Sequence, residues 1–142
     1  MKILNNVFID VIDARTREVL ETRETHNLVM TSGLKWVRDL IGGTESRASK
    51  IALGTGATAA TVSDSTLVTQ VYEQAIDRRI GTLSPAKMTH KIFVGSADAN
   101  GNDLSEVGLF RGSLLIARAV LSPAISKTDL VELTISHEIT VS

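Results

Sequence analysis

The chain has 142 residues, a formal net charge of −1 and no cysteine. This length suits one domain with a sizeable core, so folding requires neither disulfides nor a metal. The lack of cysteine excludes disulfide scaffolds, cysteine-based zinc sites and thiol catalysis. A near-neutral charge gives no general attraction to nucleic acid or to acidic membranes.

No apolar run is long enough to span a bilayer. The first ten residues are interrupted by Asn5, Asn6 and Asp10 and lack the apolar stretch of a signal peptide. We therefore expect the mature protein to begin at Met1. Aromatic residues make up only 4% of the chain, which argues against a sugar-stacking lectin or a base-stacking nucleic-acid binder.

The N-terminal part predicts a β-hairpin over about residues 1–28. Residues 7–12 alternate as a strand, residues 13–17 form a polar turn, and residues 18–28 return with mixed alternation.

A single helix is predicted at about residues 32–41, packed on a sheet. Thr31 or Ser32 is expected to be its N-cap, because a hydroxyl accepts a free backbone N–H there. The pair Gly42-Gly43 is expected to end it. The predicted apolar side consists of Leu34, Trp36, Val37, Leu40 and Ile41.

The remaining part, about residues 50–142, predicts short strands separated by turns. The expected strands are 51–53, 71–80, 87–94, 104–110, 114–121 and 131–141. The last segment alternates throughout and places His137 on its apolar face. Residues 1–142 are therefore expected to form one mainly β domain, an antiparallel β-sandwich that is immunoglobulin-like or related, with one helix.

The candidate catalytic and ligand motifs are all weak. The glycines of Gly54-Thr55-Gly56 are followed by no lysine, which predicts the end of a strand and no phosphate loop. His26, His90 and His137 lack metal-ligand spacing. The acids around residues 100–102 do not match a calcium loop, so a plain turn is expected. We predict no catalytic residue, no cofactor and no metal, and we therefore expect that the protein is not an enzyme.

Three residues are candidates for a protein interface. Arg78 is in line with Ile76 and Ile80, and Arg118 is in line with Ile116. Each arginine is either an edge-strand charge or an interface anchor, and we expect an interface for at least one. An arginine buried without a carboxylate would be too costly. His137 is expected to be a core or interface histidine.

Several short segments follow one another in a specific order. They are Thr25-His26-Asn27-Leu28-Val29, Thr31-Ser32-Gly33-Leu34, Ile51-Ala52-Leu53-Gly54-Thr55-Gly56, Asp64-Ser65-Thr66-Leu67, Glu106-Val107-Gly108-Leu109-Phe110 and Leu115-Ile116-Ala117-Arg118-Ala119. From about His26 to the end, this succession resembles small tail proteins of tailed bacteriophages. Because no partner acid, histidine or metal motif lies near Glu106 in the sequence, Glu106 is expected to start a strand, and Gly108 to allow close backbone approach or a bulge.

The resemblance implies a virion structural protein of a long-tailed siphophage. Such a protein would form a ring or collar at the tail tip or baseplate and anchor tail fibres. Its expected partners are copies of itself and other tail proteins, namely the tail tube or distal tail protein and the fibres. Nucleic acid and membranes are not expected partners. The implied location is the virion tail, with assembly in the host bacterial cytoplasm.

Three alternatives remain open. A receptor- or carbohydrate-binding tail-tip domain would show exposed aromatics in a shallow pocket. A capsid decoration protein would be found on heads. A hydrolase would need an acid pair or a triad brought together by folding.

Overall fold

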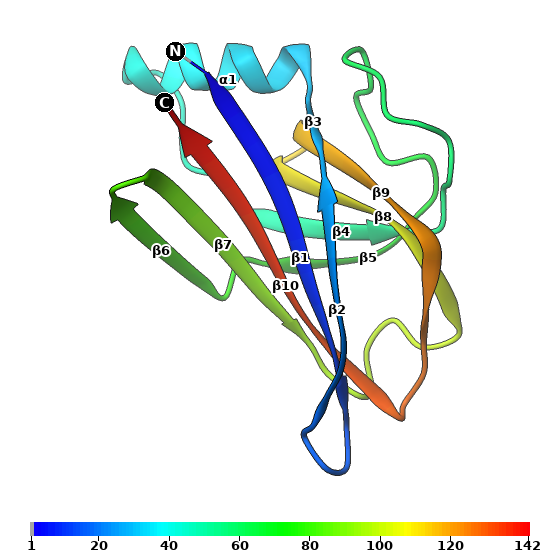
Figure 1. The fold of residues 1–142 in the computed structure, drawn as a ribbon. Helices are drawn as coiled ribbons and strands as arrows, with labels where there is room; N and C mark the ends of the chain where they lie inside the picture. Colours follow the sequence, from blue (N-terminus) through cyan, green and yellow to red (C-terminus); the bar gives the residue numbers. More distant parts are fainter. Residues whose placement is uncertain (1) are drawn as a thin grey trace.

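The computed structural model describes residues 2–142 and has two five-stranded antiparallel sheets that face one another, with one short helix at one end (Figure 1). The predicted mainly β sandwich with a single helix is confirmed for this part of the chain. The elements in order are β1 (Ile3–Asp13), β2 (Val19–His26), β3 (Leu28–Val29), α1 (Thr31–Ile41), β4 (Lys50–Gly54), β5 (Gln70–Ala75), β6 (Arg78–Leu83), β7 (Ala86–Val94), β8 (Asn102–Arg111), β9 (Leu114–Lys127) and β10 (Val131–Val141).

The first sheet, called sheet A, has the order β2-β1-β10-β7-β6. Its two central strands pair over their whole length, from Ile3 opposite Val141 to Asp13 opposite Val131. Alternate side chains on these strands point into the sandwich, as the period of two requires. The inward-facing core residues of β1, β7 and β10 are Val7, Ile9, Val11, Ile92, Val94, Leu133 and Ile135.

The second sheet, called sheet B, has the order β3-β9-β8-β4-β5. Its strand β8 is buried from Leu104 to Phe110 without interruption. One face of β8 packs against sheet A. The other face lies beneath residues 55–69, which contribute Leu67 to a small second core. The remaining members of this second core are Met30, Ala52, Phe110 and Leu115.

The strand predicted at 71–80 is wrong, because the chain changes sheets within it. Residues 70–75 form β5 at the edge of sheet B, and residues 78–83 form β6 at the edge of sheet A. Asp77 lies at the crossing, and its carboxylate accepts the backbone N–H of Phe93 at 2.8 Å. Arg78 therefore does not share a strand with Ile76.

Helix α1 packs on β9 and the core through part of its predicted apolar side, with Trp36 buried and Val37 and Leu40 partly buried. Gly33 and Trp36 are buried, whereas Leu34 and Ile41 are 53% and 77% exposed. A Cβ on Gly33 would collide with the backbone carbonyl of Ile116, so the absence of a side chain lets the helix approach the strand closely.

The predicted N-cap is also wrong. Met30 occupies that position and makes no side-chain capping bond. The hydroxyl of Ser32 instead donates to the Leu115 carbonyl at 2.6 Å, which ties the first turn of the helix to β9.

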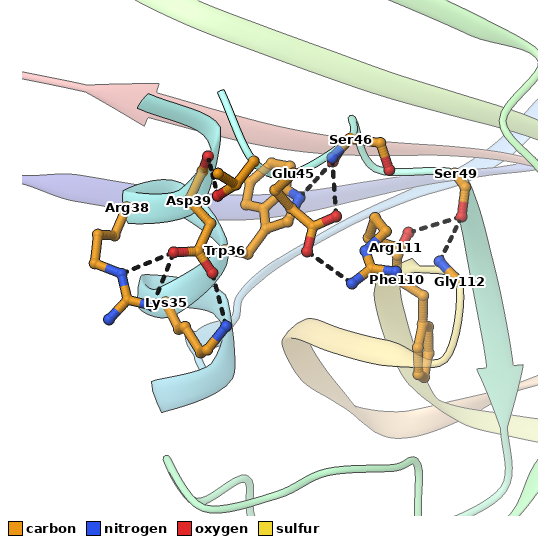
Figure 2. A network of polar contacts seen from close by, with 11 residues as sticks. Lys35, Trp36, Arg38, Asp39, Glu45, Ser46, Ser49, Phe110, Arg111 and Gly112 are labelled. Atoms are coloured by element: carbon orange, nitrogen blue, oxygen red, sulfur yellow. Dashed lines mark hydrogen bonds and ion pairs between the residues drawn. The ribbon is translucent and has the colours of Figure 1, made fainter. Parts of the chain in front are cut away.

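Polar contacts join the segment between α1 and β4 to the helix and to the turn between β8 and β9 (Figure 2). The Trp36 indole N–H donates to the Ser46 carbonyl at 2.8 Å. Arg111 donates to Glu45 at 2.7 Å, and the Gly112 N–H donates to the Ser49 hydroxyl at 2.8 Å. The segment between α1 and β4 is thus held at several points along its length.

Candidate functional site

The most polar part of the interior is a pair of opposite charges on sheet B. Glu106 of β8 is 0% exposed and Arg118 of β9 is 1% exposed. The Arg118 Nε donates to Glu106 Oε2 at 2.9 Å. Because a buried charge is tolerated only when it is paired and hydrogen-bonded, each residue makes the burial of the other possible.

Glu106 also binds the backbone of residues 55–69. Its Oε1 accepts the N–H groups of Gly56 at 3.1 Å and Thr69 at 2.8 Å. Its Oε2 accepts the N–H of Val68 at 3.0 Å. Together with Arg118, four donors meet the two oxygens of one carboxylate, so both ends of the segment are fixed by a single side chain.

Arg118 reaches the middle of the same segment. Its two terminal nitrogens donate to Asp64 Oδ2 at 3.1 Å and to the Thr58 carbonyl at 2.8 Å. Hydrogen bonds from the Thr61 hydroxyl and backbone N–H, and then the Arg118 charge, lower the pKa of Asp64. We call Glu106, Arg118 and Asp64 the buried charge cluster.

Two glycines make room for this cluster. A Cβ on Gly54 would lie 2.5 Å from the Thr69 carbonyl oxygen, and a Cβ on Gly56 would lie 2.7 Å from Glu106 Oε1. Gly54 ends β4 directly opposite Glu106, as predicted for the end of a strand. The two glycines therefore allow the close backbone approach that brings residues 55–69 over β8.

The expectation that Glu106 starts a strand is wrong. It lies in the middle of β8, where its four hydrogen-bond donors come from residues 55–69 and from β9. Gly108 does serve close packing, because a Cβ there would lie 2.8 Å from a methyl group of Leu67.

A second buried polar group lies on the inner face of sheet A. His137 of β10 is directly opposite His90 of β7, and its Nε2 contacts the amide nitrogen of Asn27. Burial, and then the proximity of His90, lowers the pKa of His137 to about 3. Burial also lowers the pKa of His90. We call these three residues the histidine cluster, and both imidazoles are neutral at pH 7.

The histidine cluster has unused hydrogen-bonding atoms but few ligands for an ion. The Nδ1 atoms of His90 and His137 have no hydrogen-bond partner among residues 2–142. Within that range, no group of three or more His, Cys, Asp or Glu side chains is placed to hold a metal.

Two of the three predicted interface residues lie inside the chain. Arg118 belongs to the buried charge cluster, and His137 is 0% exposed. Arg118 pairs with carboxylates of its own chain, and His137 lies in the core, which is one of the two places expected for it. Arg78 lies on the exposed edge strand β6, directly opposite Lys91, and its interface role stays a prediction.

The outer face of sheet A has a shallow hollow. It is lined by Phe8, Ile80, Thr89, Lys91, Ser136 and Glu138. The cation of this hollow, Lys91, lies beside the edge strand β6. In the part of the chain described, no helix has the length and apolar character needed to cross a membrane.

Comparisons with models of protein families, with curated proteins and with solved structures give no match for this chain.

Proposed function

We propose that this protein is a structural component of a bacteriophage tail, which forms a ring or collar at the tail tip or baseplate and anchors tail fibres. The order of segments from His26 onward supports this proposal. Structurally, the support comes from the two long edge strands of sheet A, β2 and β6, which lie at opposite sides of one rigid sandwich. Such edges suit repeated contacts between unlike surfaces.

The interior polar residues fit the same role. The hydrogen bonds of the buried charge cluster hold residues 55–69 in place. A subunit whose long loop is fixed in this way presents a defined surface to its neighbours. Binding then requires little ordering of the chain, which lowers its cost.

Imaging of phage particles that carry a tagged copy of this protein tests the proposal. Gold label on the tail tip or baseplate is the expected result. Label on the head would favour a capsid decoration protein, and particles without label would refute a virion role. Particles of an untagged phage provide the control for background label.

One observation favours a second candidate, a receptor- or carbohydrate-binding tip domain. The hollow on sheet A combines the aromatic ring of Phe8 with the polar groups of Thr89, Ser136 and Glu138. An aromatic side chain together with a few hydrogen-bonding groups is a combination found in small-molecule binding sites. Binding to host-cell surface glycans that is lost in Phe8→Ala would favour this candidate.

A further inference from the structure

Sheet A ends on each side in a strand whose outer backbone edge pairs with no further strand; on β2, the side chains of Arg23 and Thr25 donate to β9 carbonyls, those of Pro123 and Val120. Both β2 and β6 pair with one neighbour only, and both are largely exposed. No backbone hydrogen bond to a turn, loop or other element involves residues 19–26 or 78–83 within residues 2–142. Sheet B differs, because its edge strand β3 has only two residues. Long free edges on both sides are therefore a property of sheet A alone within the described chain.

The β6 edge has uncompensated positive charge. Arg78 lies directly opposite Lys91 of β7, on the outer face of the sheet. Like charges in that position repel one another. No ion pair among the described residues includes either side chain. A carboxylate from another molecule would relieve the repulsion.

The β2 edge has the opposite charge on the same face. Glu24 lies opposite Phe8, which lines the outer hollow, and Asp10 is its diagonal neighbour on β1. Glu24 belongs to no ion pair in the part of the chain described. The outer face of sheet A is therefore acidic at one free edge and basic at the other.

The directions of the two edge strands decide how they could meet. Four antiparallel ladders separate β2 from β6, so the two strands run in the same direction. A second copy in the same orientation would place its β6 beside β2 as a parallel ladder. An antiparallel ladder would require the second copy to be turned over, which would move its cations to the other face.

We propose that β2 of one copy pairs with β6 of the next, so that Glu24 faces Arg78 and Lys91 across the contact. Sheet A would then continue from copy to copy. This contact is head to tail, and it produces a closed ring where the rotation between copies closes. The inference rests on the self-association in the proposed function and names the surfaces involved. Pairing of β6 with β6, or of β2 with β2, would join edges of the same charge on the outer face and would bring no carboxylate to Arg78 and Lys91.

Cross-linking tests the contact directly, because the chain has no cysteine of its own. His26→Cys and Ile80→Cys place single thiols on the outer face of β2 and β6, at the same level of the sheet and two residues along from Glu24 and Arg78. With a short bis-maleimide, an equimolar mixture should give dimers that contain one of each variant, identified by a mass tag on one of them. Each variant alone should give only background dimers. Equal dimer yields from either single variant would overturn the inference.

Charge reversal tests whether the opposite charges of the β2 and β6 edges contribute to the contact. Sedimentation velocity of Glu24→Lys and of Arg78→Glu should each show self-association weakened about fivefold to tenfold. The double variant E24K/R78E restores opposite charges across the contact and should recover the association. Lys2→Glu and Asp103→Lys change exposed charges away from both edges and serve as matched controls. Failure of the double variant to recover would contradict the proposed pairing.

The outcomes for the contact and for the proposed function are separable. Self-association with cross-links other than β2 to β6 overturns the contact and leaves the tail role standing. A chain that stays monomeric up to about 1 mM overturns the contact as well. Location in the virion is decided by the imaging experiment alone.

Discussion

Replacement of Glu106 by glutamine is the sharpest test of how the loop over sheet B is held. The substitution keeps the shape of the side chain but exchanges one acceptor oxygen for an NH₂ group. If Oε1 is exchanged, the NH₂ faces the N–H groups of Gly56 and Thr69. If Oε2 is exchanged, it faces the Val68 N–H and the Arg118 Nε. In either orientation the NH₂ group, which is itself a donor, faces two other donors.

The expected loss follows from these contacts. Each buried donor left without an acceptor costs about 1–3 kcal/mol, so two of them cost about 2–6 kcal/mol. Breaking a buried ion pair by removing one partner costs about 3–5 kcal/mol, which agrees with that range. We expect Glu106→Gln to lower the free energy of unfolding by about 4 kcal/mol, a large part of the usual 5–15 kcal/mol.

Urea unfolding at pH 7 measures this loss, and amide hydrogen exchange locates it. The amides of Gly56, Val68 and Thr69 should lose protection, because their common acceptor is weakened. Glu73→Gln is the matched control. The Glu73 side chain is 47% exposed and pairs with Lys50 at the surface, so its loss should stay below about 1 kcal/mol.

A loss below about 1 kcal/mol in Glu106→Gln, with the three amides still protected, would refute the reasoning. Such a result would mean that residues 55–69 are held mainly by the apolar contacts of Leu67.

Two further predictions concern the histidine cluster and the helix. Burial holds the pKa of His137 at about 3, below the usual value near 6.5, so below pH 6.5 the unfolded chain binds a proton that the folded chain does not. The contribution of His137 to the free energy of unfolding should therefore be fully present above pH 6.5 and fall by about 1.4 kcal/mol per pH unit as the pH drops towards 3. Urea unfolding between pH 7 and 5 measures this slope, and His137→Gln should flatten it. Gly33→Ala should lower the thermal midpoint in calorimetry, since its Cβ would meet the Ile116 carbonyl, whereas Gly42→Ala, whose nearest contact would be 3.6 Å, should change it little; equal effects of the two would contradict close packing of α1 on β9.

The sandwich and its helix follow from local patterns in the sequence. Strict alternation over β10 predicts a strand with one buried face, and glycines mark the end of α1. The crossing at Asp77 could not be predicted in the same way. Tyr72, Ile76 and Ile80 alternate with Glu73, Asp77 and Arg79 across the crossing, and only the pairing of each half with a different sheet separates the two strands.

The buried charge cluster can be predicted from the sequence only in part. Counting outward from the turn at Arg111-Gly112-Ser113 places Glu106 and Arg118 within two residues of direct opposition, which is a usable signal. The contact of Asp64 with Arg118 cannot be predicted in this way, because residues 55–69 form an irregular loop with neither helix nor strand periodicity. The close contact of Gly33 with β9 is hidden for a related reason. Glycine has no side chain, so a hydropathy pattern does not indicate that it faces a strand.

The pairing of β1 with β10 has a consequence for how the protein is made. These strands join the two ends of the described chain, and the Lys2 N–H donates to the Ser142 carbonyl at 2.6 Å. Sheet A therefore stays incomplete on the ribosome until residues 131–141 have been synthesised, and the β1–β2 hairpin waits meanwhile with an unpaired edge. Contacts so distant in sequence slow folding. Until then the nascent hairpin exposes a strand edge of the kind that promotes aggregation.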